Sequence, residues 1–172
     1  MKKAIKAVIA LILITVTVIS TSSCSLLAPI ILGESSNDDS ELTAEEELYE
    51  LVNSNTELLD SLSADIITNW NGYIYNKKYN SIQAAFNAAI EENEETVNNI
   101  YDNDEKIVLL YQGIRDDYSD MSYSAQELVT AYNAYYTAVL DAQGRSYEFY
   151  TATIQQTRYS LAFALKNYYT EM

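Results

Sequence analysis

The chain has 172 residues, which is the length of a single domain. It carries 25 acidic against 10 basic residues, a formal net charge of −15, and such a surface repels phosphate backbones, so we exclude nucleic acid as a partner. The lack of histidine removes imidazole metal sites and catalytic triads that use His as the base, and the single cysteine excludes an intrachain disulfide. Four glycines and one proline favour long helices over a turn-rich β fold.

The first 24 residues have the layout of an export leader. Three lysines lie within the first six residues, and the apolar run 7–19 that follows is too short for a comfortable membrane span. Small polar residues then lead directly to Cys24. This pattern resembles the signal peptide of bacterial lipoproteins. The resemblance implies that residues 1–23 are a signal peptide and that Cys24 becomes the lipidated first residue.

The leader departs from that family at one position, and the departure leaves an alternative open. Thr21 stands three residues before the cysteine, where the family usually has an aliphatic residue. Residues 25–32 are again apolar and would lengthen an uncleaved anchor. Both alternatives place the rest of the chain outside the cytoplasmic membrane and attach it there by its N-terminus.

A tether is expected to follow the anchor. Residues 24–42 comprise the lipidated Cys24 and a spacer whose segment 33–41 is small, polar and acidic, with no aromatic residue. Such a segment cannot bury enough apolar surface to offset its ordering entropy, so the sequence predicts a flexible spacer.

The remaining residues, 43–172, are predicted to form one helical domain. Thr43 followed by Glu46 is a capping box that opens the first helix, which is expected to end near residues 70–72, before an aromatic loop over 73–80. The apolar positions of this helix step by four and three residues, as on one helix face: Leu48, Val52, Asn55, Leu59, Leu62, Ile66, Asn69 and Tyr73.

A second register of the same spacing covers residues 81–120. The polar stretch 101–105 resembles a turn in composition, but the phase on its two sides agrees, so we expect one continuous helix. The expected inward positions are Phe86, Ile90, Asn93, Val97, Ile100, Asp104, Ile107, Tyr111, Ile114, Tyr118 and Met121.

The third register begins where Ser124 is expected to cap a helix with Glu127. Its phase continues across Gly144, although residues 143–146 are equally compatible with one helix ending and another starting at a Ser146 cap. The expected inward positions are Val129, Asn133, Tyr136, Leu140, Gln143, Tyr147, Tyr150, Ile154, Thr157, Leu161, Ala164 and Tyr168.

The predicted fold is all-α. Short connections make neighbouring helices antiparallel, which gives an up-down bundle of three long helices, or four if Gly144 breaks the last one. The seven-residue spacing favours coiled-coil-like packing. Polar residues in the registers, namely Asn55, Asn93, Asp104 and Gln143, are expected to fix the alignment of the helices at some cost in stability.

The last 50 residues carry a second resemblance. The spacing Tyr132-x-x-Tyr135, the segment Gly144-Arg145-Ser146 and the helix after it are similar to small helical lipoproteins of Gram-positive bacteria. The proline that usually begins their turn is absent here, where Gln143 stands. This resemblance implies no known activity.

Tyrosine is unusually frequent, with 16 residues. Tyrosines fill wide gaps between helices with their hydroxyls in water, but they also form recognition surfaces because they offer large contact areas at low entropic cost. Two groups are candidate binding residues: Trp70 with Tyr73, Tyr75 and Tyr79 around the first loop, and Tyr132, Tyr135, Tyr159 and Tyr169, which lie off the expected register.

No motif for catalysis or metal binding is present. Asp102 and Asp104 match the start of a calcium loop, but Lys106 occupies the next ligand position and no glycine follows. Nucleophile-elbow, phosphate-loop and zinc-protease motifs are absent from the sequence. We therefore expect no cofactor, no metal and no enzymatic activity.

These observations predict a lipid-anchored extracytoplasmic helical bundle that acts as an interaction or spacer module at the cell surface. Its partners would be the membrane, through the anchor, and a cell-envelope protein or glycan. Two alternatives remain open: a binding protein for a small ligand or glycan, using a surface lined by tyrosine and tryptophan, and a self-associating homo-oligomer.

Overall fold

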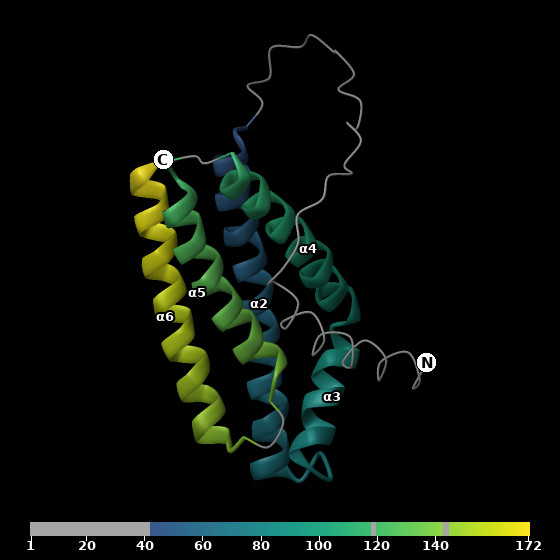
Figure 1. Ribbon diagram of the computed structural model, residues 1–172. Helices are drawn as coiled ribbons and strands as arrows, with labels where there is room; N and C mark the ends of the chain where they lie inside the picture. The colour runs from purple at the N-terminus through teal and green to yellow at the C-terminus, as the bar shows by residue number, and fades with distance from the viewer. Residues whose placement is uncertain (1–41, 118–119, 143–144) are drawn as a thin grey trace, which may run out of the picture. The chain divides into compact units, whose positions relative to one another are not determined.

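In the computed structural model, residues 42–117, 120–142 and 145–172 are described (Figure 1). These residues form five helices and no strand, so the fold is all-α, as predicted. The predictions for the leader, for Cys24 and for nearly all of the tether fall outside the described residues, as do those for Tyr118, Gln143 and Gly144.

Helix α2 (Ala44–Asn76) opens at the predicted cap. The Glu46 amide donates to the Thr43 hydroxyl at 3.2 Å, and the Thr43 amide donates to the Glu46 carboxylate at 2.9 Å. Seven of the eight predicted inward positions are buried, and Tyr73 is half-buried. These contacts confirm the predicted face of the first helix.

The predicted end of this helix, near residues 70–72, is wrong, and the helix continues to Asn76. Trp70 and Gly72 are buried, so the chain gains packing by staying helical there. The helix stops at Lys77, whose φ of 52° is left-handed, and the Lys78 amide donates to the Gly72 carbonyl at 3.0 Å. This is a Schellman-type end with lysine in the position that usually holds glycine.

The single helix predicted over residues 81–120 is instead two helices, α3 (Ile82–Glu92) and α4 (Glu94–Asp116). The break lies at Asn93, whose φ is −116° and whose side-chain amide donates to the Ala89 carbonyl at 2.9 Å. Asparagine competes in this way with the backbone bonds of a helix. The polar stretch 101–105 is helical, as predicted.

The break at Asn93 also changes which face is buried. Helix α3 buries Ala85 and Ala89, one residue before the predicted Phe86 and Ile90, which are half-buried. Beyond the break the predicted register returns, and the buried residues of α4 are Val97, Ile100, Ile107 and Ile114.

The third register is broken too, which is the four-helix alternative. Helix α5 (Ser122–Leu140) and helix α6 (Tyr147–Glu171) are separate, and Ser146 caps α6 by accepting from the Phe149 amide at 3.2 Å. The predicted Ser124 cap is wrong, because α5 starts at Ser122 and the Ser124 hydroxyl instead hydrogen-bonds the Glu171 carboxylate at the end of α6.

The predicted face of α5 is wrong in part: Val129 is buried as predicted, but the rest of the buried face lies one residue earlier. Asn133 is exposed, while Tyr132 and Tyr135, predicted to lie off the core, are buried. Because α5 ends at Leu140, its orientation about its own axis is not fixed by the orientation of α6, so the two helices need not share one register. On α6 the prediction holds, and the buried register positions are Tyr150, Ile154, Leu161, Ala164 and Tyr168.

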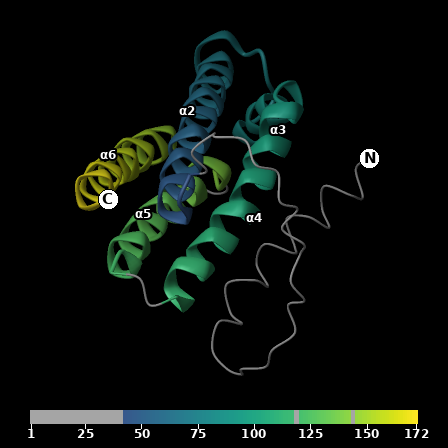
Figure 2. The ribbon, with the colours of Figure 1, turned by 90° about the horizontal axis from the view of Figure 1, so that it is seen from above.

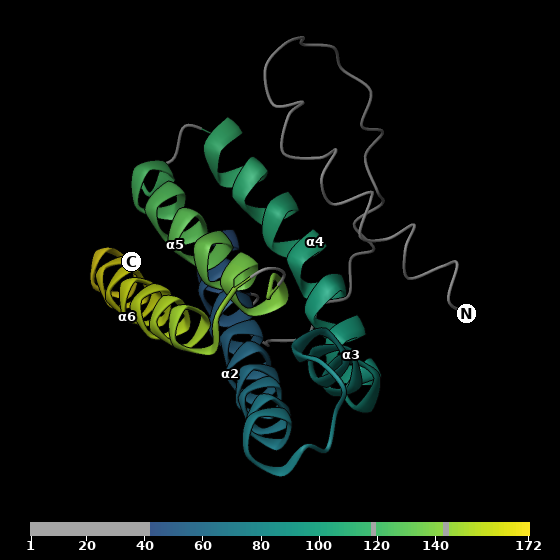
Figure 3. The same ribbon diagram turned by 90° about the horizontal axis from the view of Figure 1, so that it is seen from below.

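The helices run up and down around a shared core (Figure 1). Figure 2 and Figure 3, which look along the bundle, show four corners in the order α2, α3–α4, α5, α6. Helix α2 contacts every other helix, and α5 and α6 pair closely. One face of the bundle is therefore formed by α2 with α3–α4, and the opposite face by α5 with α6. We call α2, α3 and α4 the acidic half and α5 with α6 the C-terminal hairpin.

Candidate functional site

The structure separates the eight candidate binding residues instead of bringing them together. Trp70, Tyr132 and Tyr135 are buried in the core, and their side chains are not available at the surface. Tyr73 and Tyr79 are half-buried. The exposed candidates are Tyr75, Tyr159 and Tyr169.

Tyr132 belongs to a polar cluster inside the bundle, where α2, α4 and α5 meet. The Asn55 side-chain amide donates to the Tyr132 hydroxyl at 2.7 Å and to the Ile100 carbonyl at 3.1 Å. The Tyr132 hydroxyl also lies beside the Asp104 carboxyl. The predicted register polar Asn55 thus joins all three helices, which is the alignment role expected of it.

Asp104 is the member of this cluster whose hydrogen bonding is incomplete. Its Oδ1 atom is buried and has no hydrogen-bond partner among the described residues. Burial raises the pKa of the Asp104 carboxyl above its ordinary value, and the hydrogen bond with Tyr132 opposes that shift. Burial, followed by the nearby Asp104 carboxyl, also raises the pKa of Tyr101 and Tyr136. Tyr136 packs against the rings of Tyr101 and Tyr132, and Asn55 and Tyr132 are fully buried, so we assign the cluster to the stability of the fold.

Tyr135 lies in a second polar contact, between the acidic half and the C-terminal hairpin. Its hydroxyl donates to Asp60 Oδ1 at 2.5 Å, and Arg158 Nε donates to the same carboxylate at 2.8 Å. Burial, followed by the Asp60 hydrogen bond, raises the pKa of Tyr135. Both side chains of the ion pair are more than a third exposed, so solvent screens it and most of the value of this contact lies in its geometry.

Trp70 is enclosed by tyrosines of α6. Its ring meets Tyr150 edge-on at 4.8 Å between centroids and Tyr147 at 5.9 Å, and the Tyr150 hydroxyl donates to the Val139 carbonyl at 3.1 Å. The indole N–H is buried without an acceptor among the described residues. The tryptophan therefore packs the end of the bundle where α2 ends, which we call the far end, and does not form a ligand platform.

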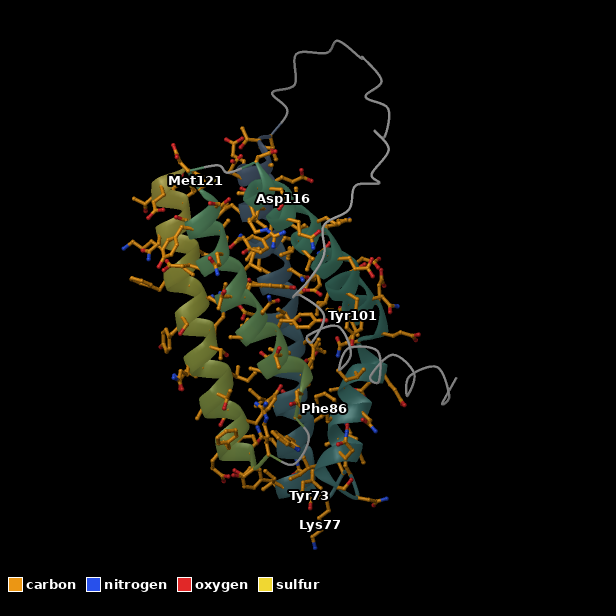
Figure 4. All side chains as sticks on the ribbon, in the orientation of Figure 1. Tyr73, Lys77, Phe86, Tyr101, Asp116 and Met121 are labelled. Carbon is orange, nitrogen blue, oxygen red and sulfur yellow. The ribbon has the colours of Figure 1, made fainter. Side chains whose placement is uncertain are left out.

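That far end is where the 73–83 segment turns. Figure 4 shows Tyr73 and Lys77 there, with Asp116 and Met121 at the opposite end of the bundle. A hollow of about 350 Å³ lies at this end, beside the last turn of α2 and the start of α3. Its lining residues are Tyr73, Ser81, Ile82, Gln83, Ala142 and Arg145.

A larger groove, of about 440 Å³, runs along the outside of the C-terminal hairpin. Ala131, Ala134 and Ser160 supply small side chains to it, and Tyr123 and Glu127 lie along it. Phe149, Tyr159 and Phe163 are exposed on α6. Except for Tyr159, none of these groove and ring residues is a candidate binding residue by sequence. The sequence does place Phe149 and Phe163 fourteen residues apart and outside the buried register, which is a signal for the two rings but not for the groove.

Charge is divided unevenly between the two faces. The three helices of the acidic half carry fifteen acidic and two basic residues, and the two helices of the C-terminal hairpin carry three acidic and two basic. The outer side of the hairpin is therefore the weakly charged and aromatic side of the molecule.

Two structural findings and the comparison with known proteins complete the description of the site. Within residues 42–117, 120–142 and 145–172, no group of three or more His, Cys, Asp or Glu side chains is placed to hold a metal ion. In the same ranges, no helix is both long enough and apolar enough to span a membrane. No protein family model, curated protein or solved structure matches the chain.

Proposed function

We propose that the protein is a lipid-anchored extracytoplasmic helical bundle that acts, without catalysis, as an interaction or spacer module at the cell surface. The observation that carries this proposal is the contrast between inside and outside on the C-terminal hairpin. Its buried tyrosines fill the interior, while Phe149, Tyr159 and Phe163 stand in water beside a groove. Several exposed rings on one helix, beside a groove, are typical of contact surfaces.

The anchor supports the same proposal from the sequence side. The leader with Cys24 resembles a lipoprotein signal, and the acidic spacer that follows would hold the bundle away from anionic headgroups by charge repulsion. A body that is acidic on one side and aromatic on the other would keep its acidic half in water and present the hairpin to a partner.

The test is crosslinking and capture from intact cells that carry the tagged full-length chain, with Cys24→Ala as the unlipidated control. We expect the wild-type chain in the membrane fraction and the Cys24→Ala chain released from it. A stoichiometric protein partner that crosslinks to wild type and is lost with Cys24→Ala would identify an adaptor. Equal membrane retention of both chains would overturn the lipid anchor, and a turnover activity of the purified protein would overturn the non-catalytic role.

A second candidate, binding of a small ligand or glycan, is favoured by the hollow at the far end of the bundle. Tyr73 gives it an aromatic wall, and Gln83 and Arg145 give it polar groups, a combination suited to a sugar ring. Cell-wall fragments titrated into the full-length protein would shift the fluorescence of Trp70, the only tryptophan, which packs nearby against Tyr147. Loss of the shift in Tyr73→Ala, with Tyr159→Ala as the matched control, would locate the site; no shift with any fragment would reject it.

A further inference from the structure

The outer side of the C-terminal hairpin combines a ridge and a groove. Phe149 and Phe163 are separated by fourteen residues, which is close to four helical turns, so they lie on one stripe of α6. They are 60% and 67% exposed, and Tyr159, one turn before Phe163, is 70% exposed. Single exposed rings are common on soluble proteins, but three lie within four turns of this one helix. The Arg145 guanidinium lies over the Phe149 ring, 5.7 Å from its centroid, while Tyr159 and Phe163 face solvent. We call these three rings the aromatic ridge.

The groove lies beside this ridge on the same face. Ser160 lines it and is one helical turn from Phe163, while its opposite wall is made by Tyr123, Thr130 and Ala134 of α5. Most of these side chains are small, so the groove has room for a ring that enters from outside. Its only carboxylate, Glu127, is hydrogen-bonded with Tyr123, and that bond raises the pKa of the Tyr123 hydroxyl.

Electrostatics selects the partner. Two copies of this chain repel each other wherever their acidic halves approach, since each acidic half carries fifteen acidic and only two basic residues. The C-terminal hairpin has a balance of three acidic to two basic residues and forms the opposite side of the bundle. It is the one broad side by which two copies can meet without facing their charges toward each other.

We propose that a second copy of this chain docks on the hairpin, with the aromatic ridge of each copy seated in the groove of the other. A two-fold axis makes the same patch serve both partners, so the patch must be complementary to itself. A ridge lying directly beside a groove on one face satisfies that requirement, because the rotation places each ridge over the partner's groove. The proposal does not depend on lipid anchoring.

The size of the face fits such a dimer. Helix α6 has 25 residues and is about 37 Å long, and two packed helices are about 18 Å wide, so the face covers on the order of 700 Å². A stable interface buries about 800 Å² of accessible surface on each partner, so a dimer of this kind would use nearly the whole outer side of the hairpin. The rings of the aromatic ridge would form its centre, where most binding energy is concentrated.

The experiment is sedimentation velocity of the purified full-length chain in mild detergent over a wide concentration range. We expect a monomer–dimer equilibrium that Phe163→Glu weakens about tenfold or more, because each dimer would bury two unpaired carboxylates. Tyr75→Glu is the matched control: Tyr75 is 75% exposed but lies at the end of α2, off the hairpin, so this variant should dimerise like wild type. Circular dichroism of both variants confirms that they fold.

A second measurement locates the contact. A photoreactive phenylalanine at position 163 of the full-length chain should crosslink to a peptide of another copy that contains Ala131 and Ala134, recognised by mixing isotopically light and heavy chains. A monomer at every concentration, equal weakening by Phe163→Glu and Tyr75→Glu, or crosslinks from position 163 only to a different protein would overturn the proposal.

Discussion

The acidic half and the C-terminal hairpin share one core but treat their aromatic residues differently. The acidic half has one strongly exposed ring, Tyr75, buries one ring, Trp70, among mostly aliphatic side chains, and carries many carboxylates on its surface. The hairpin buries four tyrosines and exposes rings as well, namely Tyr123, Phe149, Tyr159, Phe163 and Tyr169. Of these, Tyr169 packs against Tyr49 of α2 with ring centroids 5.4 Å apart. The number of tyrosines therefore says little about a surface, whereas the distribution of charge shows which side must stay in water.

The largest effect is expected from the polar cluster that joins the acidic half to the hairpin. Asn55→Ala removes the bonds to Tyr132, to the Ile100 carbonyl and from Asn103 at the point where three helices meet, while the Tyr132 hydroxyl keeps its hydrogen bond with Asp104. We expect a loss of about 2–4 kcal/mol in the free energy of unfolding, measured by urea denaturation followed by circular dichroism. Asn133→Ala, at an exposed position of α5, is the matched control and should change the free energy of unfolding by less than about 0.5 kcal/mol. Similar losses in the two variants would mean that the halves are not joined at Asn55.

Asp104 sharpens the comparison, because it is an acidic residue of the acidic half that faces inward. Its pKa is raised by burial in the folded state, so folding favours the protonated form; this stability is present below the ordinary value of 3.8 and is lost as the pH rises through the folded value. Asp104→Asn should therefore be more stable than wild type at neutral pH, by less than the loss expected at Asn55, with the difference shrinking as the pH falls toward 4. Unfolding curves at several pH values measure this.

The exposed Asp102 provides the control for that experiment. It lies on the same helix, two residues away, with its side chain in water. Asp102→Asn should change stability little and without the same dependence on pH. A stabilisation of Asp104→Asn that persists unchanged at low pH would show that loss of the buried charge is not its cause.

A smaller effect is expected at the second contact between the halves. Tyr135→Phe removes the hydroxyl that donates to Asp60 but leaves the bond from Arg158 to the same carboxylate in place. We expect a loss of about 1 kcal/mol in unfolding free energy. Tyr159→Phe, which alters an exposed hydroxyl of the hairpin, should leave stability unchanged in the same assay. If it does not, exposed tyrosines contribute to the fold as well as to the surface.

The smallest effect is expected within the acidic half, at the end of α2. Lys77 has the left-handed φ of 52° that favours glycine, so Lys77→Gly should relieve backbone strain. Glycine also loses more entropy on folding, and the net gain should be about 0.5 kcal/mol in a thermal unfolding scan. Lys78→Gly, at a residue without positive φ, should bring no gain. Equal effects at the two positions would mean that the charge of the lysines matters and not the backbone.

Much of the fold could be predicted from the spacing of apolar residues. The face of α2 and the faces of α4 and α6 were predicted because long uninterrupted helices keep one phase over many turns. The breaks were harder, since a helix phase that continues across Asn93 or residues 141–146 is compatible with either a continuous or an interrupted chain. Only tertiary packing decides between them, and each break allows the preceding helix to rotate by one residue.

The candidate site was harder to predict for the same reason. Tyr132 and Tyr135 were assigned to the surface because α5 was given the register of α6, and a shift of one residue moved both rings into the core. Trp70 was expected at the end of the first helix, beside a loop over 73–80, but α2 continues to Asn76 and buries it. The frequency of tyrosine gives no indication of Phe149 and Phe163, whose exposure depends on the rotation of α6. The surface of a bundle depends on helix rotation, which a single sequence specifies weakly.

The first and last helices meet at one end of the bundle. The Tyr168 hydroxyl donates to the Glu45 carbonyl at 3.2 Å, so the end of α6 lies beside the start of α2 although 123 residues separate the two in sequence. Domains with adjacent ends tolerate circular permutation. A permutant that joins Met172 to Leu42 by a short linker and opens the chain between Lys77 and Asn80 would keep all five helices intact. In such a molecule both chain ends would lie at the tip between α2 and α3, and a tag fused to either end would report on that tip instead of on the end where α2 begins.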